Sequence, residues 1–163
     1  MLQNLLLKDP KGVKKNRNNL QKHYYSGKKK KHTLKTQVVV NKKNSQILTV
    51  DFSNGKKHDF RLLKESKLRF NQKTKVLADT GYLGIKEIIN NSKIPYKSSK
   101  KKNLTKEEKK ENREISIKRI VVENVIGSLK RFRILSERYR NRRKRFGLRF
   151  SLIAGIHNFE IAI

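Results

Sequence analysis

Residues 75–82 read KVLADTGY, and this stretch decides the fold class. Residues 75–78 form a compact and largely apolar run, which is typical of a strand buried in the interior of a sheet. The run ends at Asp79, so a carboxylate is expected at the C-terminal end of that strand, where ligands bind in open α/β sheets. The same residue is also compatible with a turn aspartate that only caps the next helix.

Working outward from this strand, the hydrophobic pattern predicts further strands and helices. Two stretches rich in β-forming residues, 32–41 and 46–52, flank a turn cluster and predict a hairpin. Helices are expected at 59–68, 84–91, about 104–133 and 148–161, with a brief strand at 94–96. Thr105 and Glu108 form a capping box at the beginning of the long helix. Strands and helices that alternate after a hairpin indicate an α/β fold with a mixed sheet.

The first 31 residues differ from the rest of the chain. They are polar and basic and end in a run of four lysines, so we expect a largely irregular segment at 1–31 and one domain at 32–163. A chain of 163 residues is long enough for one domain with a substantial core.

The charge balance points to a partner. Lys and Arg number 43 against 13 Asp and Glu, which gives a net charge of +30. Nucleic acid is the usual partner of so basic a chain, because neutralised phosphates release counterions, although ribosomal proteins and polybasic membrane binders have similar compositions. The clustered cations expected to contact a DNA backbone are Lys28, Lys29, Lys30, Lys31, Lys100, Lys101, Lys102, Arg142 and Arg143. Such runs are equally compatible with a solvated face.

Other compositional features exclude several classes of protein. The chain has no cysteine, so it has neither a disulfide framework nor a thiolate zinc site. No apolar run approaches the length of a transmembrane helix. The short apolar stretch at 1–7 lacks the basic start and the long apolar core of a signal peptide. We therefore expect a cytoplasmic protein that contacts the nucleoid and no membrane.

Three charged residues share one face of the long predicted helix. At 100° per residue, Arg119 and Glu123 lie roughly 40° apart, and Glu123 and Lys130 roughly 20° apart. An apolar stripe beside them is expected to pack on the sheet. A carboxylate flanked by cations suits metal-assisted phosphoryl transfer, since it can hold a divalent ion while the cations grip phosphates. A surface glutamate in i,i+4 ion pairs gives the same pattern.

Taken together, these motifs resemble the DDE transposases of bacterial insertion sequences. DTGY at 79–82 is similar to the family's second-aspartate motif, and Arg119, Glu123 and Lys130 keep the spacing of its Y-R-E-K signature. The stretch from Tyr24 to Lys35 is similar to the segment after the first aspartate, and Gly55 with His58 and Asp59 to a G-x-x-H-D segment. The tyrosine of the signature is absent, because Ser116 stands at its place. The resemblance covers about residues 14–160.

The resemblance also implies a first catalytic aspartate that this chain lacks. About ten residues before Lys14 stands Asn4, and Asp9 is out of place. Synonymous codons for residues 1–11, read one nucleotide earlier from an added G, encode D-A-T-E-S-P-I-E-R-P-K, which is the family's first-aspartate motif. We therefore hypothesise that residues 1–12 are out of frame, and that fusion to an upstream-frame half of the transposase restores the aspartate.

The resemblance implies a ribonuclease-H-like mixed sheet flanked by helices, here lacking its first strand and hence marginally stable. It implies catalytic and metal-binding roles for Asp79 and Glu123, phosphate contacts by Arg119 and Lys130, and two Mg²⁺ or Mn²⁺ ions in intact relatives. His58 and Asp59 are expected near the site.

The substrates would be transposon ends and target DNA, and two copies could associate. Without the first aspartate, we expect an inactive remnant of an endonuclease that moves DNA. The alternative is a remnant that binds nucleic acid without being an enzyme.

Overall fold

The computed structural model describes residues 1–8, 24–26, 30–99, 103–139 and 143–163, and of residues 4–8 it describes only the backbone. The predicted lysine and arginine contacts at 28, 29, 100–102 and 142 lie outside these ranges.

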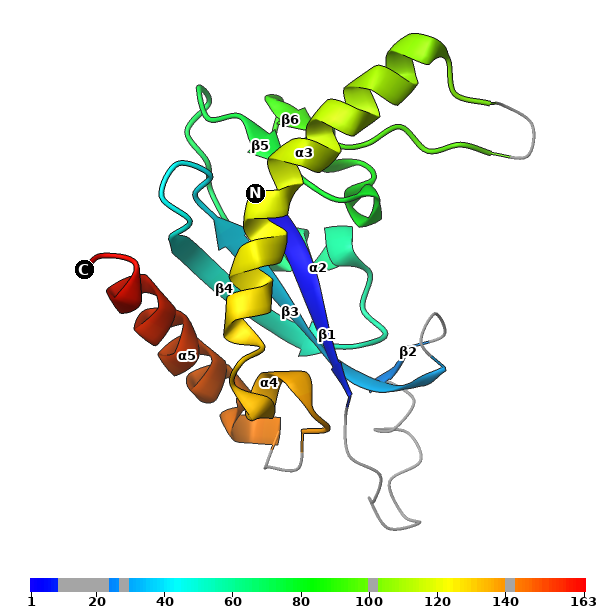
Figure 1. Cartoon of the computed structure of the whole chain (residues 1–163). Helices are drawn as coiled ribbons and strands as arrows, with labels where there is room; N and C mark the ends of the chain where they lie inside the picture. Colours follow the sequence, from blue (N-terminus) through cyan, green and yellow to red (C-terminus); the bar gives the residue numbers. More distant parts are fainter. Residues whose placement is uncertain (9–23, 27–29, 100–102, 140–142) are drawn as a thin grey trace.

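The sheet is built around strand β3 (Lys31–Val40). On one side β3 pairs antiparallel with β4 (Ile47–Asn54), and on the other with β1 (Leu2–Lys8). The short strand β2 (Tyr25–Ser26) pairs with the first two residues of β3. The predicted hairpin of β3 and β4 is therefore confirmed, with a turn at 41–45 (Figure 1).

A second, parallel pair of strands adjoins β1. Strand β5 (Val76–Leu77) pairs with β6 (Ser92–Lys93), and an isolated parallel bridge joins Leu2 to Ala78, the residue after β5. The strands thus combine antiparallel and parallel pairs, which confirms the predicted α/β class with a mixed sheet. Strand β6 lies just before the predicted strand at 94–96, where Pro95 has no N–H to donate.

Strand β1 corrects the expectation for the N-terminus. The sequence predicts little regular structure before residue 32 and a sheet without its first strand, yet Leu2–Lys8 pairs with β3 along seven residues. Local patterning missed β1 because the strand is specified by pairing with residues about 30 positions away. The expected marginal stability assumed a missing strand, and strand β1 removes that assumption.

Most of the helices follow the predicted pattern. Helix α2 (Asp59–Ser66) begins where expected. Helix α3 (Lys106–Leu129) begins with the predicted capping box of Thr105 and Glu108, but ends four residues before the expected boundary, and the short helix α4 (Arg133–Ser136) follows it. Helix α5 (Phe146–Glu160) is the C-terminal element. A single 3-10 turn, η3 (Ile85–Glu87), replaces the predicted helix at 84–91.

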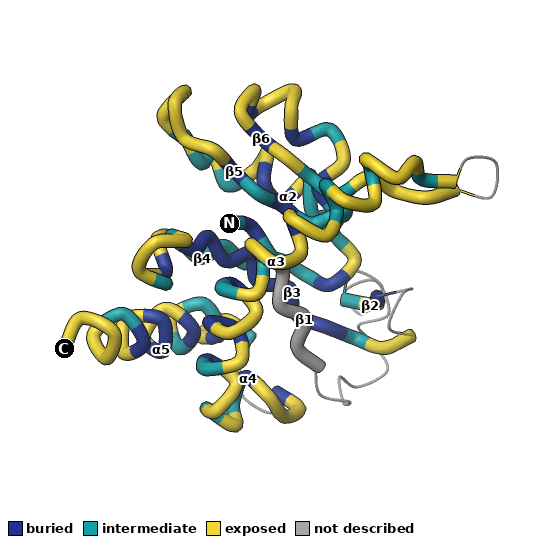
Figure 2. The backbone as a smooth tube through the Cα atoms, turned by 45° about the horizontal axis from the view of Figure 1, so that its top comes forward, coloured by how far each residue is buried: buried dark blue, intermediate teal, exposed yellow. Residues whose placement is uncertain are grey.

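Strand β3 is buried on both sides, because other elements of the fold cover both faces of the sheet. Alternate residues of a strand point to opposite faces. Leu34, Val38 and Val40 join a core cluster with apolar residues of α3 and α5. Val39 and Leu2 join a second cluster with residues from α2, from η3 and from the 3-10 turn η2 (Thr80–Tyr82). The result is a layered arrangement with the buried stretch of β3 in its interior (Figure 2).

Two polar side chains fix α5 to its neighbours. The buried ring of His157 lies 3.0 Å from Ser128 Oγ through Nδ1 and 3.3 Å from the Ser45 carbonyl oxygen through Nε2. The Asn158 amide accepts a hydrogen bond from the Ile47 N–H and donates one to the Ile47 carbonyl, both at 2.8 Å. The apolar side chains that α5 and the C-terminus leave exposed include Leu148, Leu152, Phe159 and Ile163.

Candidate active site

Asp79 lies two residues after the end of the short strand β5 and is the N-cap residue of the turn η2. Its Oδ1 accepts a hydrogen bond of 2.7 Å from the backbone N–H of Thr80, so the residue does cap the turn. The side chain nevertheless remains 41% exposed, which leaves its carboxylate accessible. Capping and a role in binding are therefore compatible at this position.

The rest of the DTGY motif anchors Asp79 in the fold. Tyr82 is completely buried, and its hydroxyl donates a hydrogen bond of 3.2 Å to Gln37 Oε1 on β3. The Tyr82 N–H also donates to the carbonyl oxygen of Asp79, at 3.0 Å. The loop therefore leaves β5, presents Asp79 at the surface and returns to the core within three residues.

Helix α3 brings a second carboxylate to the same place. Arg119 Nη1 lies 3.3 Å from Asp79 Oδ1, and Arg119 Nη2 lies 3.8 Å from Glu123 Oε1. The Arg119 side chain is only 15% exposed, and its Nε is buried without a hydrogen-bond partner among the described residues. One guanidinium thus links two carboxylates that are 44 positions apart in the sequence.

Lys130, the last residue of the predicted signature, lies at the end of this helix. It is the C-cap residue of α3 and is exposed. The seven residues from Glu123 to Lys130 span about 10 Å at 1.5 Å per residue. Lys130 therefore lies about two helical turns from Glu123, along the same side of α3.

A partly buried ion pair lies next to the DTGY loop. Lys35 Nζ lies 2.5 Å from Asp59 Oδ1 and also donates to the carbonyl oxygen of Lys57. Asp59, expected near the site, is the first residue of α2 and contacts Gly81, two residues after Asp79. The sequence did not single out Lys35 as a functional residue, because a lysine in a strand usually faces solvent.

The G-x-x-H-D segment is explained by close packing. Gly55 donates a backbone hydrogen bond of 2.9 Å to the Thr33 carbonyl, and a Cβ at this position would lie 1.8 Å from Thr33 Oγ1. His58 is the N-cap residue of α2, and its side chain makes no capping hydrogen bond. The segment therefore places Asp59 at the beginning of α2.

Comparison with known proteins gives the family. Residues 10–158 match the family described as DDE superfamily endonuclease. The chain belongs to this family. It is also 52% identical over 143 residues to a protein from Microchaete diplosiphon described as a probable transposase for insertion sequence element IS702. The match covers 88% of this chain and 52% of that protein, so the chain spans about half the length of this relative. No solved structure matches the chain.

The region that matches the DDE superfamily endonucleases contains Asp79, Arg119 and Glu123, the three residues that the structure brings together. Residues 1–9 lie outside the match, and strand β1 falls within them. The candidate site therefore lies entirely within the region that the family match covers, and strand β1 lies outside that region.

The donor atoms at this site fit a divalent cation such as Mg²⁺. Hard cations prefer oxygen ligands, and Mg²⁺ is usually bound through one or two carboxylates together with phosphate oxygens. The Asp79 and Glu123 side chains are 41% and 56% exposed, so both can reach a ligand from solvent. Among the residues whose side chains are described, no group of three or more His, Asp or Glu is arranged to hold a metal by itself.

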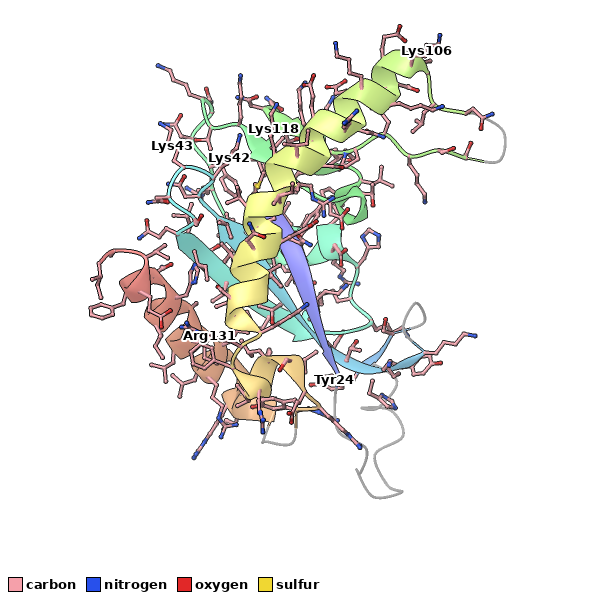
Figure 3. The ribbon with its side chains drawn as sticks, viewed as in Figure 1. Tyr24, Lys42, Lys43, Lys106, Lys118 and Arg131 are labelled. Carbon is pink, nitrogen blue, oxygen red and sulfur yellow. The ribbon has the colours of Figure 1, made fainter. Side chains whose placement is uncertain are left out.

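The other cations predicted to contact DNA lie in different surroundings. Lys30 and Lys31, both predicted to contact DNA, are exposed. The Arg143 guanidinium instead lies over the Tyr24 ring, 4.3 Å from its centroid, and is half-buried. Lys42, Lys43 and Lys118 line a hollow of about 690 Å³ that the sequence did not single out, and they lie together in Figure 3.

In the described part of the chain, no helix has the length and apolarity needed to cross a membrane.

Proposed function

We propose that this chain is the C-terminal part of a DNA transposase whose substrates are insertion-sequence ends and target DNA. In this proposal Asp79 and Glu123 are two of the three carboxylates of a metal-dependent site for DNA strand cleavage and transfer. The observation that supports it is the convergence of Asp79 and Glu123 on Arg119, within a region that matches the DDE superfamily endonucleases.

The order of the strands supports a ribonuclease-H-like interpretation of the sheet. Antiparallel pairing joins β4 to β3 and β3 to β1, and parallel pairing then joins Leu2 to Ala78 and β5 to β6. Asp79 comes directly after Ala78, the residue that bridges to Leu2, so it lies at a carboxyl end of the parallel part of the sheet. Carboxyl ends of parallel strands are where open α/β sheets bind their ligands.

Each residue has a distinct part in the proposed site. A divalent cation bound by Asp79 and Glu123 would supply Lewis-acid activation of the attacking oxygen, which is water or a 3′-hydroxyl. Arg119, already oriented by both carboxylates, would hold a non-bridging phosphate oxygen beside them. Lys130, about two turns further along α3, would contact the next part of the DNA backbone.

We infer that this chain alone does not cleave DNA. No aspartate stands between Met1 and Lys8, and the family match begins only at residue 10. The match thus leaves out residues 1–9, which are most of the segment at 1–12 that the hypothesis places out of frame. The missing carboxylate would then come from an upstream-frame half of the protein, and pairing of two copies would assemble the complete complex.

A plasmid-nicking assay tests this proposal. Supercoiled DNA is incubated with the chain and Mg²⁺ or Mn²⁺, and the expected result is no nicking. Nicking that disappears in Asp79→Ala would contradict inactivity. The DNA upstream of the start codon tests the frame hypothesis, which requires a G directly before the ATG and an in-frame coding region. A fused product of both frames should nick DNA, and Asp79→Ala in that product should not.

A nucleic-acid-binding remnant is the alternative function, and the net charge of +30 favours it. Salt-dependent binding to DNA is expected of both functions, because each phosphate contact releases counterions. Metal-dependent cleavage by the fused product separates them. If the fused product binds DNA but never cleaves it, the charge-based function is the correct one.

A further inference from the structure

We propose that the partly buried pair of Lys35 and Asp59 positions Asp79, by fixing the loop that presents its carboxylate. This inference deepens the function proposed above and rests on it, since Asp79 is there a metal-binding residue. Lys35 and Asp59 are positioning residues and do not themselves touch the metal or the DNA.

The burial of Lys35 is the first observation. Its side chain is 8% exposed and that of Asp59 is 25% exposed, so both charges are largely removed from water. Placing a charge in such surroundings is costly unless a partner compensates it. Lys35 has two acceptors, the Asp59 carboxylate at 2.5 Å and the Lys57 carbonyl. Both acceptors lie at or just before the start of α2, so β3 fixes the beginning of that helix.

The second observation is the contact between Asp59 and Gly81. A Cβ at Gly81 would lie 2.2 Å from Asp59 Oδ2 and 3.1 Å from its Cγ. The Asp59 carboxylate therefore occupies the space in which a side chain at position 81 would project. Gly81 does not have a positive φ, so the backbone conformation alone would accept alanine. An alanine at this position would therefore have to displace the Asp59 carboxylate, which Lys35 holds through Oδ1.

Strand β3 holds two successive residues of this loop, Gly81 and Tyr82. Lys35 reaches Gly81 through Asp59, and Gln37 binds the hydroxyl of Tyr82. Residues two apart in a strand point to the same face, so one face of β3 fixes both contacts. Asp79 lies only two residues before Gly81. The position of its carboxylate therefore depends on a charge pair that lies outside the site.

Asp59→Asn tests this inference, because it keeps the size of the side chain and removes its charge. Glu65→Gln is the matched control, since Glu65 lies on the same helix, pairs with Lys57 and Arg61, and is exposed. Hydrogen exchange of the Thr80 and Tyr82 amides, which both donate to Asp79, reports on the loop. We expect exchange about tenfold faster in Asp59→Asn, since a hydrogen bond to a charged group contributes about that factor. Equal exchange in Asp59→Asn and Glu65→Gln would overturn the inference.

A double-mutant cycle keeps the test valid if Asp59→Asn weakens the whole fold. Gly81→Ala introduces a Cβ against the Asp59 carboxylate, whereas in Asp59→Ala the nearest remaining atom of that residue would be Cβ, at 3.4 Å. Mn²⁺ binding measured by electron paramagnetic resonance is the readout. Gly81→Ala is expected to weaken Mn²⁺ binding about tenfold in the wild-type background and less than twofold in Asp59→Ala. Equal losses in both backgrounds would overturn the inference.

Asp79→Ala separates this inference from the proposed function. If Asp79→Ala leaves Mn²⁺ binding unchanged, the proposed metal site is wrong, whatever the state of the loop. Hydrogen exchange of the loop does not require metal, so it still decides whether Lys35 and Asp59 hold the loop. Faster exchange in Asp59→Asn together with unchanged Mn²⁺ affinity would contradict positioning and indicate a purely structural pair.

Discussion

The Arg119 guanidinium lies 3.3 Å from Asp79 Oδ1, across 40 residues of sequence. The same group faces Glu123, so Arg119 neutralises part of the negative charge that would attract a divalent cation. A bound cation and Arg119 would therefore compete for the two carboxylates until a phosphate draws the guanidinium away.

Arg119→Gln is accordingly expected to raise the affinity for Mn²⁺ in the absence of DNA. The change removes a positive charge next to the carboxylates. The gain should be on the order of fivefold, since ion pairs between partly exposed groups contribute at most about 1 kcal/mol. Isothermal titration with MnCl₂ measures it, and Lys118→Gln, the neighbouring exposed cation of α3, is the control. An unchanged or weaker Mn²⁺ affinity in Arg119→Gln would count against the competition.

Neutralising Lys30 and Lys31 is expected to weaken DNA binding and to lower its salt dependence. Both side chains are exposed and free to lie along a backbone. Each phosphate contact contributes about 0.9 to the slope of log K against log salt concentration. The double change Lys30→Gln and Lys31→Gln should therefore reduce the slope by up to about 2, measured by fluorescence anisotropy. Lys93→Gln is the control, because Glu111 pairs with Lys93 at 2.7 Å. If Lys93→Gln lowered the salt slope as much as the double change does, specific contacts of Lys30 and Lys31 with the DNA would be contradicted.

Asn158→Ala is expected to destabilise the fold by about 2 kcal/mol, because it removes two hydrogen bonds of about 1 kcal/mol each. Both bonds join the amide to the backbone of Ile47 in β4. Denaturant unfolding measures the change in free energy. Asn112 offers a matched control, since its amide binds the N–H and carbonyl of Tyr96 in the same way but at an exposed position. Asn112→Ala should cost less, because water replaces the lost partner. Equal losses would show that burial at Ile47 is unimportant.

Ionisation of Asp51 is expected to lower the free energy of unfolding as pH rises. Burial raises the pKa of Asp51 above its ordinary value of 3.8, and the Gln37 side chain partly offsets the shift. Between pH 3.8 and the raised pKa, the folded state binds more protons than the unfolded state, so ionisation of Asp51 disfavours folding in that window. Asp51→Asn should therefore raise the melting temperature at pH 7 by up to about 2 °C, with the difference shrinking below pH 3.8.

Glu65 provides the opposite case for comparison. Its pKa is lowered by hydrogen bonds from Lys57 and Arg61, so its favourable contribution is present above pH 4.5 and is lost as pH falls through the lowered pKa. Glu65→Gln should lower the melting temperature at pH 7, in contrast to Asp51→Asn. Thermal melts of both variants from pH 3 to 7 check the signs. A lower melting temperature for Asp51→Asn at pH 7 would contradict the proposed cost of burial.

The sequence predicted the elements whose signals are local. The hairpin of β3 and β4 and the capping box at Thr105 were predicted from neighbouring residues alone, and both are confirmed. Strand β1 was missed, because its structure depends on pairing with a distant strand. The 84–91 segment contains a helical pattern of isoleucines, yet only one 3-10 turn forms there.

The candidate site was predictable in part. The helical spacing of Arg119 and Glu123 indicated that they share a face, and the family motif paired them with Asp79, which the structure brings to the same guanidinium. Lys35 was not predictable in this way. Its partner Asp59 lies 24 positions away on another element, and no periodic pattern distinguishes a buried lysine from a solvated one.

The contact between Asp59 and Gly81 has a consequence for sequence variation. Two positions 22 residues apart share one volume, and the carboxylate at 59 fills the space that any larger residue at 81 would need. Related sequences should therefore change these positions jointly, with a bulkier residue at 81 only where 59 has become smaller. In copies of the gene that no longer encode a working protein, this mutual restriction should disappear.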